Sequence, residues 1–207
     1  MVVTGLLIVD VQNDFLPGGA LGVKNGDQIL PVINKLLDYP FDVIIATGDW
    51  HPYRHGSFAE THGKDVGDVI DLNGLKQILW PRHCVQKTSG AEFSKDWNHQ
   101  KVHKVFHKGT DENIDSYSAF FDNGHLKSTG LHEYLQTKGI KTLYVAGLTT
   151  EYCVKYSVLD AISLGYEVYV IMDACKPVNL HPRDEEQAWQ EILRQGAHVI
   201  SSLGLKI

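Results

Sequence analysis

The chain has 207 residues, a length that suits one domain with a full hydrophobic core. Hydrophobic residues make up 43% of the chain and charged residues 21%, and the formal net charge of −6 indicates neither a nucleic-acid partner nor an anionic membrane surface. The apolar runs are too short to span a bilayer, we expect no signal peptide, and three cysteines without framework spacing favour a reducing, cytoplasmic location.

Strand-like and helix-like segments alternate along the chain. Apolar runs typical of strands cover residues 5–11, 43–47, 102–107, 142–147, 167–172 and 198–201. Most of these runs are continuous rather than alternating, as expected of strands that are buried on both faces. Helical patterns cover residues 26–37, 130–138, 151–164 and 182–196. This order predicts an α/β fold, a doubly wound, mainly parallel six-stranded sheet with helices on both faces, formed by residues 1–207 as a single domain.

The stretch from about residue 49 to residue 100 departs from this alternation. It is rich in His, Gly, Pro and Asp and shows little periodicity, and a loop region of this length inside a compact domain is usually functional. It opens with the segment DWHPYRH (49–55) and later contains the segment WPRHC (80–84). One carboxylate and two or three imidazoles suit Zn²⁺, Fe²⁺ or Mn²⁺, so a site for one divalent metal ion is predicted here. A polar loop with exposed histidines is the alternative.

Three reactive side chains follow predicted strands, at the edge where ligands bind in doubly wound sheets. Asp10 follows the first strand, Lys108 follows the third, and Cys153 lies in the first turn of the predicted helix 151–164. Free N–H groups and the helix dipole at that turn favour a nucleophilic thiolate. A carboxylate can take the thiol proton, and an ammonium group favours both charged forms. Taken together the three predict covalent catalysis, although each alone suits a turn, surface or core residue.

Two further features surround the cysteine. The backbone N–H groups of residues 147–153, at a helix start, suit an oxyanion site. Four aromatic side chains, each of which alone suits the core, could line a slot for a flat ring: Phe15, Trp50, Trp80 and Tyr117. The sequence therefore favours hydrolysis of a small planar substrate.

Six segments carry a resemblance that covers nearly all the chain. They are LLIVDVQNDFLPGGAL (6–21), TGDWHPYRHGSFA (47–59), WPRHCVQKTSGAEF (80–93), VFHKGTDENIDSYSAFFDN (105–123), GLTTEYCVKYSVLDAISLGYEV (147–168) and DACKPV (173–178). In these segments, and in their order, the chain resembles the nicotinamidase/pyrazinamidase group of the isochorismatase-like cysteine hydrolase superfamily.

The resemblance implies an amidohydrolase that converts nicotinamide to nicotinate and ammonia through a cysteine thioester and serves NAD salvage. It implies pyrazinamide as a further substrate and Zn²⁺ before Fe²⁺ or Mn²⁺ as the metal. Nicotinamide is the expected partner, no nucleic-acid or membrane partner is expected from the charge, and the chain could form a homo-oligomer. It also implies a cis peptide bond between Leu148 and Thr149. The roles that it implies are a catalytic triad of Asp10, Lys108 and Cys153; an oxyanion hole of the Thr149 and Cys153 N–H groups; substrate-binding positions at Phe15, Trp80, Tyr117 and Leu148; and metal ligands at Asp49, His51, His55 and His83.

The chain departs from the family pattern before its cysteine. Similar enzymes commonly carry Ala-Thr-Asp where this chain has Thr149, Thr150 and Glu151, which puts pocket shape and rate in question more than reaction class. Three other functions are weighed. Many isochorismatases lack the cysteine, N-carbamoyl amide hydrolases are not expected to carry this metal loop, and a thiol redox or metal-binding module would be favoured by a Cys-x-x-Cys pair that the chain lacks.

Overall fold

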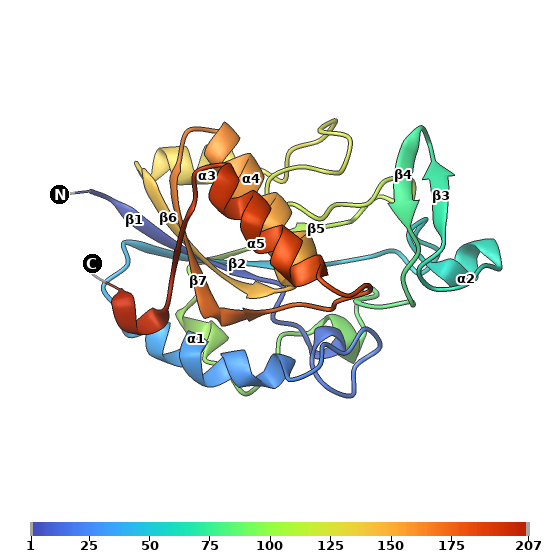
Figure 1. Cartoon of the computed structure of the whole chain (residues 1–207), viewed down its shortest axis with the longest axis horizontal. Helices are drawn as coiled ribbons and strands as arrows, with labels where there is room; N and C mark the ends of the chain where they lie inside the picture. The colour runs from blue at the N-terminus through green and yellow to red at the C-terminus, as the bar shows by residue number, and fades with distance from the viewer. Residues whose placement is uncertain (1, 206–207) are drawn as a thin grey trace.

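A parallel sheet forms the middle of the molecule (Figure 1), in a computed structural model that describes residues 2–205. The strand order is β5-β2-β1-β6-β7-β8, and every neighbouring pair in this six-stranded sheet is parallel. Its strands are β1 (Thr4–Val9), β2 (Val43–Asp49), β5 (Lys104–Lys108), β6 (Thr142–Leu148), β7 (Glu167–Lys176) and β8 (His198–Ile200). The predicted fold class and its six strands are confirmed, with strand ends that differ by a few residues.

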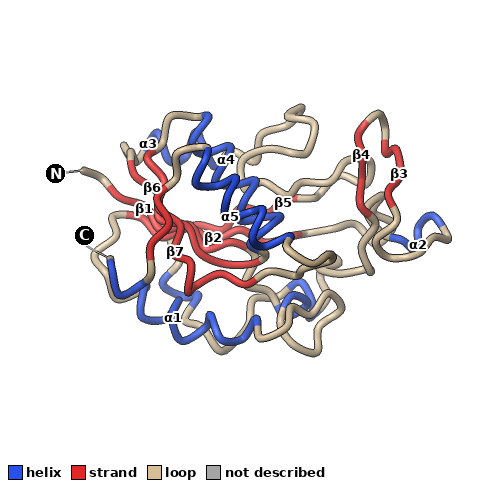
Figure 2. Tube along the Cα trace, viewed as in Figure 1, coloured by secondary structure: helices blue, strands red, loops and turns tan. Residues whose placement is uncertain are grey.

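Helices cover both faces of the sheet (Figure 2). One face carries α1 (Leu30–Leu36), and the other carries α3 (Leu131–Thr137), α4 (Lys155–Ser163) and α5 (Asp184–Arg194). All four were predicted, but two begin differently from expectation. A 3₁₀ turn at Gly26–Ile29 precedes α1, and a π turn at Thr150–Val154 precedes α4.

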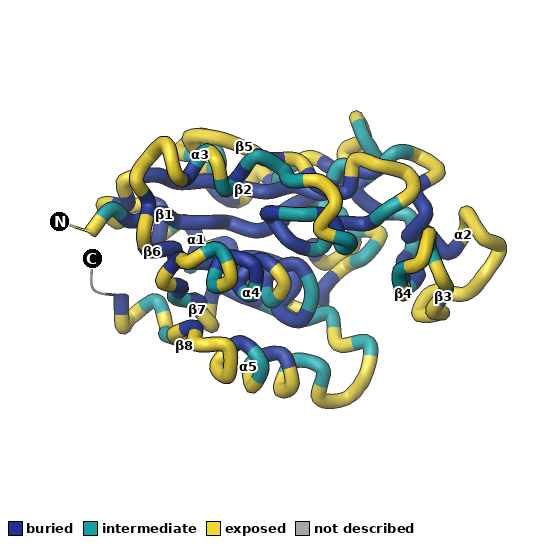
Figure 3. Tube along the Cα trace, turned by 90° about the horizontal axis from the view of Figure 1, so that it is seen from above, coloured by how far each residue is buried: buried dark blue, intermediate teal, exposed yellow. Residues whose placement is uncertain are grey.

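The core consists of two layers, one on each side of the sheet. Leu6 and Ile8 of β1 point to the α1 side, and Leu7 and Val9 point to the side of α3, α4 and α5. Successive side chains of a strand face opposite sides, so a strand with helices on both faces must be apolar throughout. All residues of β1 are buried for this reason, and Figure 3 shows the central strands as buried tube between exposed outer turns.

A hairpin that the sequence analysis did not predict stands at the end of the molecule away from both termini (Figure 1). It consists of β3 (Val69–Leu72) and β4 (Leu75–Ile78), which pair antiparallel, and the short helix α2 (Ala59–His62) lies nearby. Asn73 and Gly74 form its two-residue turn, and both have positive φ angles of 53° and 88°. This turn suits a twisted hairpin, because both central residues must adopt left-handed backbone.

The sheet reverses its winding direction between β1 and β6. From β1 the chain proceeds to β2 and β5 on one side, and it then returns to β6 and continues to β7 and β8 on the other. A crevice opens at the carboxyl ends of the strands where such a reversal occurs. Among the described residues, no helix combines the length and apolar character that crossing a membrane requires.

Candidate active site

Four strands deliver reactive side chains to one crevice. Asp10 directly follows β1, Asp49 is the last residue of β2, Lys108 is the last residue of β5, and Cys153 lies five residues beyond the end of β6. Asp49 and Lys108 are paired across neighbouring strands, and the Asp10 N–H donates to the Thr47 carbonyl at 3.3 Å. The strand ends therefore bring together residues that lie far apart in the sequence.

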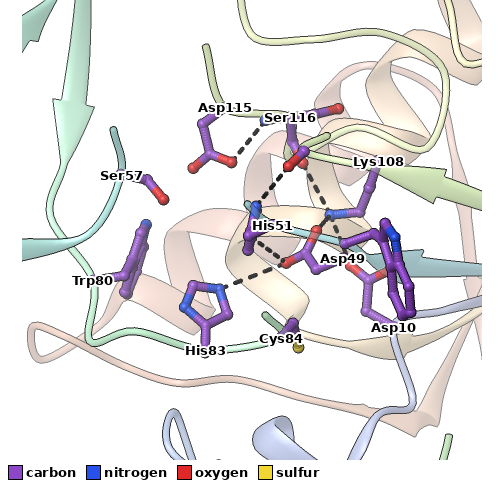
Figure 4. Close-up of polar contacts among 12 residues, drawn as sticks. Asp10, Asp49, His51, Ser57, Trp80, His83, Cys84, Lys108, Asp115 and Ser116 are labelled. Carbon is purple, nitrogen blue, oxygen red and sulfur yellow. Dashed lines mark hydrogen bonds and ion pairs between the residues drawn. The ribbon is translucent and has the colours of Figure 1, made fainter. Parts of the chain in front are cut away.

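Lys108 is the centre of this cluster (Figure 4). Its Nζ atom lies 2.9 Å from Asp10 Oδ2 and donates hydrogen bonds to Asp49 Oδ1, to the Ser116 carbonyl at 2.9 Å and to Cys153 Sγ at 3.3 Å. The lysine side chain is fully buried, and so is that of Asp10. A buried ammonium group is stable only beside negative charge, and two carboxylates supply it here.

The two carboxylates differ in proton affinity. Burial raises the pKa of Asp10, and the nearby charge of Asp49 raises it further, while Lys108 opposes both effects. Burial also raises the pKa of Asp49, but Lys108 and His51 outweigh burial and hold that pKa well below its usual value. Asp49 is therefore the fixed anion and Asp10 the better proton acceptor. The Thr47 hydroxyl donates to Asp10 Oδ1 at 2.7 Å and orients this carboxylate.

Cys153 lies in the π turn rather than in a regular first helical turn. The Val154 N–H donates to the Thr149 carbonyl at 3.1 Å, which is the wider spacing of a π turn and a feature often found at functional sites. One carboxylate oxygen each of Asp10 and Asp49 lies within 4.8 Å of the Cys153 sulfur. Burial raises the pKa of Cys153 well above its usual value, although Lys108 lowers it. A neighbouring carboxylate that takes the thiol proton, as the sequence analysis expects, would offset this effect of burial.

A buried cluster of one carboxylate and several imidazoles lies beside the lysine. His51 Nε2 and His83 Nε2 lie 3.4 and 3.6 Å from Asp49 Oδ2. His55 lies on the other side of His51, with ring centroids 4.2 Å apart, and a second triplet of His51, His55 and Asp115 has its donor atoms within 4.8 Å of one another. Three predicted ligands, Asp49, His51 and His83, thus lie close to one another, and His55 contacts this group at His51.

The histidines are oriented as metal ligands usually are. Their Nδ1 atoms are occupied: that of His51 lies 2.8 Å from the Gly109 carbonyl, that of His55 lies 2.7 Å from Ser57 Oγ, and that of His83 lies 2.7 Å from the Pro81 carbonyl. Such outer contacts leave Nε2 to face an ion.

Burial and the neighbouring His51 lower the pKa of His55 to about 4, so this imidazole is neutral. Its Nε2 atom is buried and has no hydrogen-bond partner among the described residues. Neutral imidazoles and a carboxylate are ligands that Zn²⁺ accepts, and the residues present fit a divalent ion.

A small cavity opens beside Cys153 and the cluster. Its lining consists of Phe15, Leu21, Asp49, Trp80, His83, Asp115, Tyr117, Thr149, Tyr152, Cys153 and Val178. The cavity thus combines aromatic side chains with Cys153 and with Asp49 and His83 of the buried cluster.

Three of the four predicted substrate-binding side chains line this cavity: Phe15, Trp80 and Tyr117. The Trp80 indole donates to the Tyr117 hydroxyl at 3.1 Å, which joins two of the aromatic walls. Leu148 is buried in the core cluster on the α1 side, and its side chain is not part of the lining. Trp50 stacks on His107 with centroids 4.6 Å apart and does not line the cavity either.

Sequence reasoning missed other members of the site. Asp115, Tyr152 and Val178 line the cavity, and no local motif marks them. Gln12 braces the metal loop, because its side chain donates to the Asp49 carbonyl at 2.8 Å and accepts from the Asp49 N–H at 2.8 Å. A glutamine two residues beyond Asp10, which follows the first strand, is a signal that could have been used for Gln12. The peptide bond between Leu148 and Thr149 is cis, as the resemblance implies.

A doubly wound parallel sheet that gathers a buried cysteine, lysine and aspartate is the arrangement expected of a cysteine hydrolase. Within that class, residues 4–203 match the family model of the isochorismatase domain, and the chain belongs to this family. The chain is 47% identical over 195 residues to the nicotinamidase of Escherichia coli (strain K12), an alignment that covers 93% of this chain and 92% of the relative.

Two solved structures extend the comparison. The nicotinamidase/pyrazinamidase structure of Acinetobacter baumanii superposes with a TM-score of 0.95 at 44% identity and covers 99% of this chain and 98% of its own. The structure of the pyrazinamidase of Pyrococcus horikoshii, in complex with zinc, superposes with a TM-score of 0.78 at 37% identity and covers 96% and 99%.

Proposed function

We propose that this chain is a nicotinamidase, an amidohydrolase that converts nicotinamide to nicotinate and ammonia and accepts pyrazinamide as well. One observation carries the proposal: Lys108 Nζ contacts both Asp10 and Cys153, 2.9 Å from the carboxylate and 3.3 Å from the sulfur, at the edge of a cavity with aromatic walls. The high identity to relatives of this activity over nearly the whole chain supports the same conclusion. The expected role is NAD salvage.

The first half of the reaction forms a thioester. The Asp10 carboxylate takes the Cys153 proton, and the resulting thiolate attacks the amide carbon, so that the C–S bond forms and the carbonyl oxygen becomes an oxyanion. The raised pKa of Asp10 makes it an effective acceptor for this proton. As the C–N bond breaks, protonated Asp10 gives its proton to the departing nitrogen, and ammonia leaves.

The second half of the reaction hydrolyses the thioester and again uses Asp10 to move the proton. Asp10 takes a proton from a water molecule, which attacks the thioester carbon, and the C–S bond breaks to release nicotinate. The Cys153 sulfur then recovers its proton from Asp10. Lys108 remains protonated throughout, because the two buried carboxylates raise its pKa well above its usual value despite the opposing effect of burial. Its positive charge stabilises each anionic form of its two partners.

The oxyanion is assigned to the backbone N–H groups of Thr149 and Cys153, two residues that line the cavity. Hydrogen-bond donors held in place before the reaction stabilise the charge that develops on the carbonyl oxygen. Loss of one such donor costs on the order of 3 kcal/mol in comparable sites. The aromatic side chains of Phe15, Trp80 and Tyr117 are assigned to the pyridine ring.

The metal site is assigned to Asp49, His51 and His83, with His55 as a fourth ligand, and Zn²⁺ is the first choice of ion. The zinc complex of the archaeal relative supports this choice. A bound divalent cation supplies a Lewis acid beside the substrate cavity, able to hold a ring nitrogen or a water molecule. Asp49 and His83 line the cavity, so these two ligands join the metal site to the ring site.

Ammonia release from nicotinamide by the purified enzyme, measured together with elemental analysis, tests the proposal. We expect turnover with nicotinamide and pyrazinamide and one divalent ion per chain. An enzyme that contains the ion but releases no ammonia from either amide contradicts the proposed function.

A further inference from the structure

A buried carboxylate belongs to the π turn Thr150–Val154 that carries Cys153, and it takes no part in the reaction described above. Glu151 stands two residues before Cys153 and is 4% exposed. Its Oε2 atom accepts a hydrogen bond from the Val178 N–H at 3.2 Å, and its Oε1 atom accepts one from the Asn179 N–H. Burial raises the pKa of Glu151, while these two N–H groups lower it. The carboxylate thus connects the turn to a segment 27 to 28 residues away.

That segment, residues 177–183, links β7 to α5 and contains no helix or strand of its own (Figure 1). Other hydrogen bonds attach it to the start of α5. The Glu185 N–H donates to Asn179 Oδ1 at 3.1 Å, and the His181 N–H donates to Asp184 Oδ2 at 2.7 Å. The two bonds to Glu151 instead hold the segment against the cysteine turn.

Val178 is the point at which this connection reaches the substrate cavity. Its side chain lines the cavity together with Cys153 and packs against the core on the α1 side, while its N–H is held by Glu151. Because the Val178 N–H is hydrogen-bonded and the Val178 side chain is packed, this part of the cavity wall has little freedom to move. Shortening the acid by one methylene would retract its oxygens by about 1.5 Å, more than either hydrogen bond can absorb.

We propose that Glu151 is a positioning residue that holds Val178 as one wall of the ring pocket and thereby sets the size of ring that the enzyme accepts. The inference rests on the proposed amidase function and deepens it. It also gives a structural meaning to the glutamate that stands where similar enzymes commonly carry aspartate. A residue that only stabilised the fold would alter melting temperature and the amount of active enzyme, whereas a wall residue alters KM and selectivity between rings.

The test compares Glu151→Gln, Glu151→Asp and Val178→Ala with the unchanged enzyme. Each is assayed for ammonia release from nicotinamide and from the bicyclic quinoline-3-carboxamide. Glu151→Gln keeps the length of the side chain but has one acceptor oxygen, and Glu151→Asp keeps the charge but is shorter. For all three we expect KM for nicotinamide to rise about tenfold, the lower end of the effect of one methylene in an apolar pocket, with kcat within about twofold.

Selectivity for ring size supplies a second readout. The ratio of kcat/KM for the bicyclic amide to kcat/KM for nicotinamide should rise in both Glu151→Gln and Val178→Ala. The double variant that combines these two changes should show no further increase, because both changes release the same wall. Glu186→Gln is the matched control, since Glu186 is exposed in the first turn of α5 and should change neither quantity.

The results separate this inference from the proposed function. If the unchanged enzyme does not hydrolyse nicotinamide, the function is wrong. If it does, but the Glu151 variants keep the original KM and selectivity, lose only kcat, or add their effect to that of Val178→Ala, then the positioning role is wrong. Circular dichroism checks that each variant folds, and Val178→Ala with Glu151→Asp keeps the comparison available should Glu151→Gln fold poorly.

Discussion

The Nζ atom of Lys108 lies 3.3 Å from the Sγ atom of Cys153, and both side chains are buried. The two residues come from opposite sides of the winding reversal, one from the end of β5 at the sheet edge and one from the turn after β6. The same ammonium group faces Asp10 and Asp49. A single positive charge therefore lies beside the proposed nucleophile, its proposed base and a proposed metal ligand.

Replacing Lys108 by methionine should lower stability as well as activity. Asp10 would then be buried without a countercharge, and Asp49 would keep only His51 and His83 beside it. Breaking a buried ion pair from one side costs about 3–5 kcal/mol. The measurement is the free energy of unfolding in denaturant, and adding Asp10→Asn to Lys108→Met should recover part of the loss. Equal stability of Lys108→Met and the unchanged enzyme would show that the carboxylates are neutral in the folded protein.

Replacing Cys153 by alanine should abolish ammonia release while the fold and the metal content stay intact. The sulfur forms the bond to the substrate, and no other thiol lines the cavity in the described residues. Cys175→Ala is the matched control, because Cys175 is equally buried but lies outside the cavity, and it should retain turnover. Ammonia release by Cys153→Ala at the original rate would exclude the thioester route.

The strand ends before Asp10 and Cys153 were predictable because continuous apolar runs mark buried parallel strands. The segment before Lys108, VHKVFH (102–107), is mixed, in keeping with the exposure of β5 at the sheet edge. The topology of the sheet then determines that these ends meet. The clustering of Asp49, His51 and His55 was predictable from their compact spacing, which places them on one loop. His83 lies further along the chain and was assigned with them.

The features that escaped prediction have two different causes. The hairpin of β3 and β4 has the turn Asn73–Gly74 between two short alternating segments, a signal that the sequence does contain. Asp115 and the bond between Glu151 and Val178 depend on contacts across long stretches of chain, for which no local pattern exists.

Removing a metal ligand should empty the metal site without unfolding the protein. His83→Ala takes away a buried imidazole whose Nε2 faces Asp49 at 3.6 Å, so we expect the affinity for Zn²⁺ to fall by at least about 10–100-fold. Competition with a chromogenic chelator measures this affinity directly. His198→Ala is the control, since that side chain is 54% exposed and far from the cluster, and it should retain full metal content. Unchanged affinity in His83→Ala would contradict the assigned ligand set.

Removing metal from the unchanged enzyme should raise KM for nicotinamide, because two of the assigned ligands, Asp49 and His83, line the substrate cavity. Dialysis against a chelator, with metal loss verified by elemental analysis, provides the apoenzyme, and readdition of Zn²⁺ should restore the original KM. An apoenzyme that binds substrate as tightly as the metal-loaded form would show that the ion does not contact the ring.

Replacing Asp10 by asparagine should abolish turnover and yet make Cys153 easier to alkylate. The Asp10 carboxylate raises the pKa of Cys153 by its charge and by its hydrogen bond, after burial, which is the main cause. Without that charge the pKa falls, and the thiolate fraction at a given pH rises. Alkylation by iodoacetamide at about pH 8, followed by mass spectrometry, measures this fraction. Turnover is still lost, because no group remains to carry the proton to the departing nitrogen.

The other two cysteines provide the internal control for this experiment. Burial raises the pKa of Cys175 to about 12 and that of Cys84 well above its usual value, so both should resist iodoacetamide in the folded protein and react only after denaturation. Nicotinamide should protect Cys153 in both forms of the enzyme, since the thiol lines the cavity. Slower alkylation of Cys153 in Asp10→Asn than in the unchanged enzyme would contradict the claim that the Asp10 charge raises the pKa of Cys153. It would mean that the carboxylate acts mainly by drawing the proton away from sulfur in the resting state.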